Sequence, residues 1–249
     1  MVGYVVTGEI IEHASGKKFQ DVLEEAFIRP LNVEGELYIG IPPGVESRLA
    51  ASVAMDTYDL SKLDPKANPA SATFLPSSLT LSTVSNLLNT LDGRCAIVAA
   101  ANGHLLARAV ARYYAALVDG SVVPPRHPSV NNENKEGTTD EVDYKSTIFA
   151  NTTEKIHDAF LGSGDYNNLI FPNGMFGLGF CRFLTTAGSL LGFGPAGSGG
   201  STAYCDINNR FAIAVTLNKF SAGSLTGEII RFICLELELP VPLDYAGSS

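Results

Sequence analysis

The pattern of apolar and polar residues predicts two adjacent strands in the last third of the chain. Residues 201–207 are expected to form the first strand and residues 211–217 the second. Asn208 and Asn209 lie between them and tolerate positive φ, which suits a tight hairpin turn. The sequence therefore predicts an antiparallel hairpin near the C-terminus.

The second of these strands is apolar on both faces. Its larger residues alternate with smaller ones, so Ala212, Ala214 and Thr216 should face away from them. The larger residues are Phe211, Ile213, Val215 and Leu217. A strand with almost no polar break is typical of a sheet that has helices on both sides.

Apolar residues at helical spacing predict two helices near the N-terminus. The first, over residues 5–13, breaks near Ser15-Gly16. The second carries one apolar stripe and should end at Pro30, because proline cannot continue a helix. The residues of that stripe are Phe19, Val22, Leu23, Ala26 and Phe27.

Two more helices are expected downstream. Residues 105–118 should form one, with Asn102 as N-cap, Gly120 as C-cap glycine and His104 bonded to nearby backbone. The last helix should end at Pro240. Its apolar stripe consists of Leu225, Ile229, Ile230, Ile233 and Leu237.

Two segments have the composition of loops. Residues 40–80 are rich in Pro, Ser and Ala, which is typical of a loop-rich excursion that roofs a cleft. Residues 131–166 are polar and acidic, which predicts a solvated loop or insertion. His127 and His157 lie in or beside that segment and should face solvent.

Composition narrows the class of protein. The 249 residues are 45% hydrophobic and 17% charged, as in a globular chain, and the net charge of -9 argues against nucleic-acid binding. No apolar run approaches the roughly 20 residues of a membrane span, and no secretion signal begins the chain. An intracellular location is favoured, although the compartment is not specified. The four cysteines are far apart, so neither a metal site nor a disulfide framework is expected.

Glycine is concentrated in residues 192–200, directly before the predicted hairpin. Gly192, Gly194 and Gly197 match the dinucleotide fingerprint G-x-G-x-x-G, and Ser198 lies in an approximate nucleophile elbow G-x-S-x-G. Both motifs require a helix after the turn, whereas a strand is expected here. Neither activity is favoured, and no cofactor is expected.

The same stretch resembles the β-lactamase-related serine hydrolases, which are relatives of penicillin-binding proteins. The similarity rests on Gly-Phe-Gly-Pro-Ala-Gly-Ser-Gly-Gly-Ser over residues 192–201, a strand ending in Asp, a short turn and a strand ending in Leu-Asn. Members usually carry His or Lys, a small residue and Gly on the strand that lines the cleft. Pro195, Ala196 and Gly197 occupy these positions, so the basic residue is absent.

Other segments resemble the family in the family's own order. The resemblance covers nearly the whole chain and is closest to the plant β-lactamase-like domain that follows an atypical kinase-like domain of the aarF type. The matching segments are residues 8–12, 15–19, 28–32, 101–117 and 176–180.

The resemblance implies an α/β fold of the α+β type, with an antiparallel sheet flanked by helices plus a mostly helical half, in one structural domain. Residues 1–130 would be the helical half, 131–168 a polar loop or insertion, and 169–249 the sheet hairpin and closing helix. In the family, the first strands and the nucleophile helix precede the point at which this chain starts. The chain is therefore expected to be an N-terminally truncated, later part of that fold.

The family's chemistry is acyl transfer by a serine, with Lys and Tyr moving protons and two backbone N–H groups holding the oxyanion. The N–H of Ser198 would be one of those donors. Ser15 and Lys18 formally match Ser-x-x-Lys, but they lie in a turn between helices, where Ser15 is expected to be a surface N-cap. Alignment on Gly8 places the Asn of the family's Tyr-x-Asn motif at Met1. The resemblance therefore predicts no catalytic residue in this chain.

Two hypotheses about function remain. The chain is either a non-catalytic β-lactamase-like module that binds or scaffolds, or a serine hydrolase whose nucleophile half comes from an upstream segment or another chain. The resemblance places the early strands of the fold beside residues 211–217. Without them this strand is an apolar sheet edge, through which self-association or pairing with an upstream segment is expected.

Overall fold

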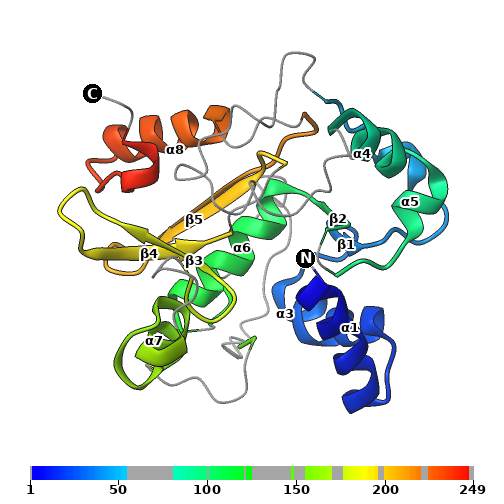
Figure 1. The fold of residues 1–249 in the computed structure, drawn as a ribbon, viewed down its shortest axis with the longest axis horizontal. Coiled ribbons are helices and arrows are strands. Elements are labelled where there is room, and N and C mark those ends of the chain that lie inside the picture. Colours follow the sequence, from blue (N-terminus) through cyan, green and yellow to red (C-terminus); the bar gives the residue numbers. More distant parts are fainter. Residues whose placement is uncertain are drawn as a thin grey trace, which may run out of the picture.

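The chain forms an antiparallel four-stranded sheet with helices on both faces, beside a smaller group of helices around a two-stranded sheet (Figure 1). The computed structural model describes residues 2–54, 81–99, 101–120, 122–124, 147–148, 155–169, 176–195, 199–219 and 224–246.

The larger sheet has the strand order β3-β4-β5-β6, so each strand pairs with its neighbour in sequence. The predicted hairpin is confirmed, because β5 and β6 are antiparallel from Thr202 opposite Val215 to Asp206 opposite Phe211. The four strands are β3 (Cys181–Leu184), β4 (Leu190–Gly194), β5 (Thr202–Asp206) and β6 (Phe211–Val215).

The turn of this hairpin differs from the prediction. Neither Asn208 nor Asn209 has positive φ, whereas Arg210 does, at 50°. Asp206 accepts hydrogen bonds from the backbone N and the side-chain Nδ2 of Asn209, at 3.1 and 2.7 Å. The Arg210 guanidinium donates to both carboxylate oxygens of Asp119, at 2.8 and 2.9 Å. Asn209 therefore hydrogen-bonds to the last residue of β5, and Arg210 joins the turn to Asp119 at the C-terminal end of α6.

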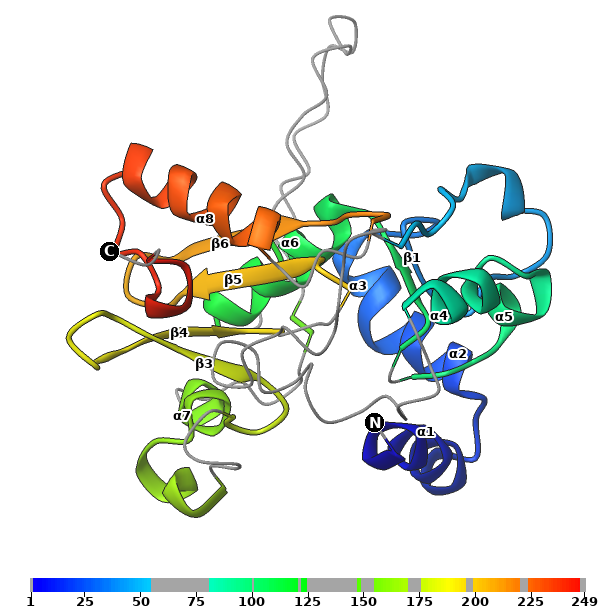
Figure 2. The same cartoon turned by 45° about the horizontal axis from the view of Figure 1, so that its top comes forward.

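Helices cover the two faces of the larger sheet (Figure 2). Helix α6 (Ala107–Val118) and helix α7 (Lys155–Leu161) contribute to one core cluster, and α8 (Ser224–Glu236) to the other. Ala212 and Ala214 pack on the α6 side. Phe211, Ile213 and Val215 pack on the α8 side. The predicted alternation along β6 is confirmed.

The smaller group contains the N-terminal helices and a short sheet. Strand β1 pairs antiparallel with β2, and short helical turns connect the remaining elements. The elements are α1 (Val2–Ser15), α2 (Phe19–Leu23), the π-helix η1 (Glu24–Ile28), α3 (Arg29–Leu31), β1 (Leu37–Ile39), the 3-10 turn η2 (Glu46–Arg48), α4 (Leu81–Leu88), α5 (Leu91–Cys95) and β2 (Gly103–Leu105). Two further 3-10 turns, η4 (Gly164–Leu169) and η5 (Leu243–Tyr245), pack beside the larger sheet, on α7 and on α8.

Pro30 does not end the second helix, which corrects the prediction. The chain passes through the π-helical turn η1 and ends its helical path at Asn32, which is left-handed with φ of 54°. A π-helical turn bonds residues five apart, and the Arg29 N–H donates to the Glu24 carbonyl oxygen in this pattern. Val33 N donates to the Ile28 carbonyl oxygen at 3.1 Å and closes the helix end around Asn32. The widened turn accommodates a residue that has no N–H to donate.

The helix expected from residue 105 begins two residues later, at Ala107. Residues 103–105 pair with β1 instead, so Leu106 occupies the N-cap position and Asn102 does not. Gly120 has φ of 64° just after the helix, as expected of a C-cap glycine.

The predicted stripe of α8 is confirmed in its centre and wrong at its ends. Ile230 is fully buried, as is Cys234, whereas Leu225 and Leu237 are 53% and 55% exposed. The helix ends at Glu236, before Leu237 and the predicted end at Pro240. The small residues at the start of the helix explain the difference. A Cβ atom on Gly227 would lie 2.9 Å from the ring of Tyr245, so only glycine allows this close approach.

The loop predictions are corrected at His157. It is half-buried on α7, with its Nε2 2.7 Å from the Leu117 carbonyl oxygen, so it joins α7 to α6 instead of facing solvent.

Residues 176–180, one of the segments that resemble the family, directly precede β3. A Cβ on Gly177 would lie 2.0 Å from the Phe160 carbonyl oxygen, which accounts for a glycine there.

Several of the predicted loop residues lie outside the described part of the chain. They are His127, most of the 40–80 segment (residues 55–80) and most of the 131–166 segment (residues 131–146 and 149–154).

Replacement of Glu238 by glycine should stabilise the protein. Glu238 follows α8 with φ of 55°, while Leu239 N bonds back to the Cys234 carbonyl oxygen at 2.8 Å, a helix ending that favours glycine. We expect Glu238→Gly to raise the free energy of unfolding by about 0.5–1 kcal/mol, measured by urea denaturation. The matched control is Glu236→Gly at the last residue of α8, where φ is not positive, and this change should lower the free energy of unfolding by up to about 1 kcal/mol. Equal effects of the two changes would contradict this interpretation.

Candidate functional site

The segment predicted to line the cleft begins at the end of β4. Pro195 is half-buried, and its carbonyl oxygen accepts a hydrogen bond from Thr202 Oγ1 at 3.3 Å. Proline offers neither a charge nor an N–H group. That Pro195 occupies the position of the family's basic residue stays a prediction. Ala196, Gly197 and Ser198 lie outside the described residues, so their place in the cleft and the oxyanion role of Ser198 remain predictions.

The glycines before this segment serve the packing of the sheet. A Cβ atom on Gly192 would lie 1.7 Å from the Cys205 carbonyl oxygen, and one on Gly194 would lie 2.2 Å from that of Ala203. Both atoms belong to the backbone of β5, so no side-chain movement relieves the clash. Gly200 has positive φ, at 88°, in the turn that leads into β5. The glycine density thus reflects close backbone approach and a turn within the protein itself.

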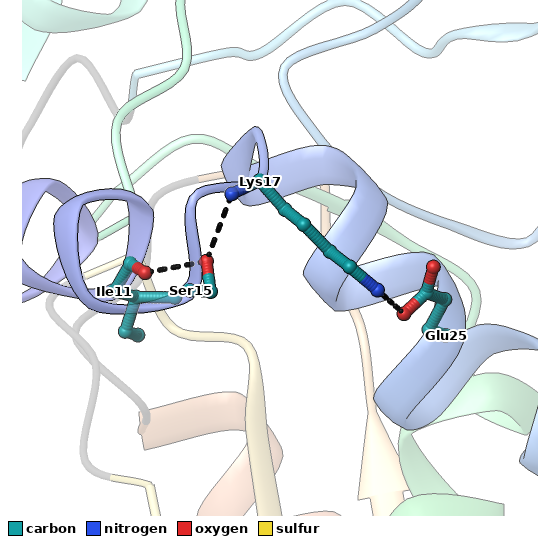
Figure 3. A network of polar contacts seen from close by, with 4 residues as sticks. All are labelled: Ile11, Ser15, Lys17 and Glu25. Carbon is teal, nitrogen blue, oxygen red and sulfur yellow. Dashed lines mark hydrogen bonds and ion pairs between the residues drawn. The ribbon is translucent and has the colours of Figure 1, made fainter.

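The serine of the Ser-x-x-Lys match lies at the C-terminal end of a helix, whereas the motif requires it at an N-terminal end (Figure 3). Ser15 is the last residue of α1. Its Oγ donates to the Ile11 carbonyl oxygen at 2.6 Å and accepts from Lys17 N at 3.2 Å. The hydroxyl proton is therefore committed to a helix carbonyl and not to a base.

The lysines that follow Ser15 are also engaged elsewhere. Lys17 Nζ pairs with Glu25 Oε2 at 2.5 Å (Figure 3). Lys18 Nζ lies 3.6 Å from Glu12 Oε2, and its side chain is 79% exposed. Exposed pairs of this kind contribute about 0–1 kcal/mol to stability. They leave no lysine poised to take a proton from Ser15.

The expectation that Ser15 caps the next helix is wrong. Lys18 occupies the N-cap position of α2 and makes no side-chain cap. Glu12 supplies the cap from α1, because its Oε1 accepts from Phe19 N at 2.8 Å. The turn is thus an ordinary helix-helix junction.

Burial keeps the thiols of the larger sheet protonated. It raises the pKa of Cys181 to about 11 and also raises the pKa values of Cys205 and Cys234. A protonated thiol is a poor nucleophile and a poor metal ligand. Cys205 Sγ instead donates to the Phe193 carbonyl oxygen at 3.0 Å.

The buried tyrosines are equally unsuited to accept protons. Burial raises the pKa of Tyr113 to about 12, and burial followed by the nearby Asp206 raises the pKa of Tyr204 further above its usual range. The Tyr204 hydroxyl is buried and has no hydrogen-bond partner among the described residues. It lies inside the core between the sheet and α8.

A buried polar cluster surrounds Asn102, and the sequence pattern did not indicate it. Asn102 is 3% exposed, and its Nδ2 donates to the carbonyl oxygens of Gly93, Arg94 and Ala96 at 2.8, 3.1 and 2.6 Å. Its Oδ1 lies 3.1 Å from Nε2 of His104. The amide oxygen only accepts, so this imidazole nitrogen carries the proton. The cluster fastens the end of α5 to β2.

Within the described residues, no group of three or more His, Cys, Asp and Glu side chains is arranged to hold a metal ion. None of the helices in this part of the chain is long and apolar enough to cross a membrane.

A mixed fold with an antiparallel sheet between helices is the arrangement of beta-lactamase and penicillin-binding-protein-like domains. The Beta-lactamase family sequence profile matches residues 1–233. The chain belongs to this family.

Two solved structures share the fold. EstA from Arthrobacter nitroguajacolicus Rue61a is 19% identical with a TM-score of 0.54, over 86% of this chain and 51% of EstA. A penicillin-binding protein homologue from Caulobacter crescentus is 24% identical with a TM-score of 0.52, over 86% of this chain and 50% of the homologue. This chain therefore spans about half the length of either. No curated protein sequence matches it.

Alanine at position 192 should unfold the protein or nearly so. Its Cβ would overlap the Cys205 carbonyl oxygen, and separating β4 from β5 breaks sheet hydrogen bonds. We expect Gly192→Ala to cost more than about 3 kcal/mol in urea denaturation. The control is Gly8→Ala within α1, where the new Cβ has ordinary contacts, at 3.5 Å from Ala99 Cβ, and should stabilise by up to about 1 kcal/mol. A mild effect at position 192 would show that the strands do not approach so closely.

Acid should destabilise the protein through His104. Burial, and then the charge of Arg94, lower the pKa of His104 in the folded state. The unfolded chain then binds the proton more tightly, so the free energy of unfolding should fall as the pH drops below about 6.5. We expect the loss between pH 7.5 and 5.5 to be smaller in His104→Asn, measured by urea denaturation at each pH. An identical loss in both proteins would exclude His104 as the cause.

Proposed function

We propose that this chain is a non-catalytic module of the beta-lactamase family, which acts by binding instead of by acyl transfer. The observation that carries the proposal is the state of the Ser-x-x-Lys match. Ser15 lies at the C-terminal end of α1, and its hydroxyl donates to the Ile11 carbonyl oxygen. Serine attack on a carbonyl needs a base beside the hydroxyl, and both neighbouring lysines pair with glutamates.

The cleft-lining segment supports the same conclusion. Pro195 stands where the family carries His or Lys, so no charge at that position can hold a substrate carboxylate or assist proton transfer. A backbone oxyanion donor at Ser198 would stabilise a tetrahedral intermediate, but it generates no nucleophile. The residues of this chain therefore supply a scaffold for the reaction without its reactive groups.

A second function is favoured by the length comparison. EstA and the penicillin-binding protein homologue are about twice as long as the segment that this chain covers. A serine hydrolase would result if another polypeptide, or a segment joined upstream, supplied the nucleophile, its lysine and the tyrosine. In that assembly the present chain would contribute the sheet and the oxyanion donor.

We further propose a subgroup and a location. The subgroup is the plant β-lactamase-like domain that follows an aarF-type kinase-like domain, and it rests on the sequence patterns over residues 8–32 and 176–218. The location is intracellular, and it rests on four cysteines whose spacing suggests no disulfide framework.

The isolated chain should hydrolyse neither nitrocefin nor p-nitrophenyl esters above the rate in buffer, because it lacks an activated nucleophile. The measurement is absorbance at high protein concentration, compared with Ser15→Ala and Ser198→Ala proteins. All three should give the same background.

Two results would contradict the proposal. Turnover that disappears in Ser198→Ala but not in Ser15→Ala would assign the nucleophile to the glycine-rich turn. Turnover that disappears in Ser15→Ala would assign it to the Ser-x-x-Lys match.

A further inference from the structure

Residues 51–53 form a strap that runs between the end of α4 and the end of β6. The backbone N of Ser52 donates to Oδ1 of Asn89 at 2.8 Å, and Nδ2 of the same asparagine donates to the Ser52 carbonyl oxygen at 2.7 Å. Ser85, which is 3% exposed on α4, adds a bond from its Oγ to that carbonyl oxygen at 2.7 Å. Both backbone polar groups of Ser52 are therefore bonded to α4 and the residue that follows it.

The other side of the strap is bonded to a residue just beyond β6. Val53 N donates to the Asn218 carbonyl oxygen at 2.8 Å, and Asn218 Nδ2 donates to the Ala51 carbonyl oxygen at 3.0 Å. Val53 also forms a parallel bridge with Lys219. Successive residues of an extended segment direct their backbone groups to opposite sides. The strap is thus held as a short strand between two asparagines.

Ser201 continues this path to the glycine-rich segment, residues 192–200. Its Oγ accepts from Leu217 N at 2.9 Å and donates to the Leu217 carbonyl oxygen at 3.2 Å. Leu217 directly precedes Asn218, and Ser201 directly follows Gly200. A continuous series of hydrogen bonds and peptide bonds therefore leads from α4, through the strap, to the end of the glycine-rich segment.

The end of the glycine-rich segment has a second attachment, on α8. Thr226 is completely buried, and its Oγ1 donates to the Gly200 carbonyl oxygen at 2.7 Å. This bond joins the segment to the helix that covers the larger sheet and does not pass through the strap. The position of residues 200–201 therefore depends on two anchors, one on α8 and one that reaches back to α4.

The α4–α5 unit is anchored differently from the elements around it. None of the three buried core clusters in the described part of the chain includes a residue of α4 or α5, whereas Leu31 of α3 packs with Ala109 and Ala116 of α6. Polar contacts hold the two ends of the unit, at Ser52 and at Asn102. Regions with few buried apolar contacts open locally at lower free energy than the core. The unit is therefore able to shift relative to the sheet.

We propose that the strap couples the position of α4 to that of the glycine-rich segment, with Asn89 as the positioning residue. A primary amide donates and accepts at once, so it bonds both backbone groups of Ser52 as a neighbouring strand does. Loss of these bonds frees the strap and, with it, the residues just beyond β6. The end of the glycine-rich segment then loses one of its two anchors. Coupling between two sites is reciprocal, so loosening at Ser201 reaches α4 in turn.

The first test is amide hydrogen exchange of Asn89→Leu, followed by NMR. Ser52 N–H loses its acceptor directly, and its exchange should accelerate about tenfold or more. Leu217 N–H keeps its own acceptor, Ser201 Oγ, and its exchange should still accelerate about threefold or more because the strap couples it to α4. Leu178 N–H, which is bonded beside α7, reports on the stability of the whole chain and should not change.

The same helix offers a matched control. Asn86 is an exposed residue three positions earlier, and it takes no part in the bonds to Ser52 that the structure describes. Asn86→Leu should therefore leave exchange at Ser52 and Leu217 unchanged. If Asn89→Leu fails to fold by circular dichroism, Ser85→Ala is the milder variant, because it removes one of the two donors to the Ser52 carbonyl oxygen.

The second test asks whether the coupling runs through the strap. Val53→Pro combined with Asn218→Ala removes both bonds between the strap and Asn218, since proline has no N–H and alanine has no Nδ2. The bonds between Ser52 and Asn89 are left in place. In this background Asn89→Leu should still accelerate exchange at Ser52, but no longer at Leu217.

The third test runs in the opposite direction. Ser201→Ala removes the clamp on Leu217, and exchange at Ser52 should accelerate about threefold or more. The control is Ser189→Ala, an exposed serine before β4, which should leave exchange at Ser52 unchanged.

Four outcomes would overturn the proposal. An unchanged Leu217 amide in Asn89→Leu, or an unchanged Ser52 amide in Ser201→Ala, would show that the strap transmits nothing. Equal effects of Asn86→Leu would assign the change to general loosening of α4. A response of Leu217 that persists without the bonds to Asn218 would place the coupling on another route. These measurements use no substrate, so none of them depends on whether the chain is catalytic.

Discussion

The close approach of β4 to β5 is the constraint on which the larger half of the structure depends. Gly192 and Gly194 bring the two backbones so near that a Cβ at either position would collide with a β5 carbonyl oxygen. Phe193 lies between them, completely buried, with ring centroids 5.0 and 5.1 Å from those of Phe160 and Phe180. The glycines set the strand spacing, and the phenylalanine joins the sheet to α7. The glycine pattern resembles a ligand-binding turn, but Gly192 and Gly194 allow two strands to pack closely.

This assignment changes what the glycine-rich stretch says about function. Glycine next to a substrate and glycine next to a neighbouring strand produce the same sequence, because both relieve a steric clash. The structure separates them at Gly192 and Gly194. These two glycines therefore give no evidence of a bound ligand, and Pro195, which follows them, contributes no charged side chain. The geometry of the sheet at Gly192 and Gly194 is thus explained by packing, and the match of Pro195 to the family's basic residue stays a prediction.

The sequence predicted correctly those features that depend only on residues close together in the chain. Alternation along residues 211–215 depends on the pleat of one strand, and the positive φ of Gly120 on one helix end, and both are confirmed. The start of the buried face of α8 was missed because Gly227 fits against Tyr245, 18 positions away in the sequence. Asn102 was expected to cap a helix, but its side chain donates to three carbonyl oxygens at the end of α5 instead. No local sequence pattern indicates these partners. The candidate cleft was located by resemblance only, and its central residues lie outside the described part.

The distribution of burial shows where the fold remains open to a partner. On the α6 side the aromatic cluster is closed by the chain itself, with Tyr114 and Phe193 buried among its own helices. On the α8 side Leu225, Phe232 and Leu235 are each more than half exposed, and β6 beside them is half-buried throughout. Apolar surface of this kind gains about 25 cal/mol for each Å² removed from water. Burial of the exposed face of α8 would therefore gain hydrophobic free energy, as would burial of Leu87 on α4 and Leu91 on α5, which are 62% and 56% exposed. An apolar patch alone accepts many partners, whereas a strand edge with two apolar faces selects those that match its register.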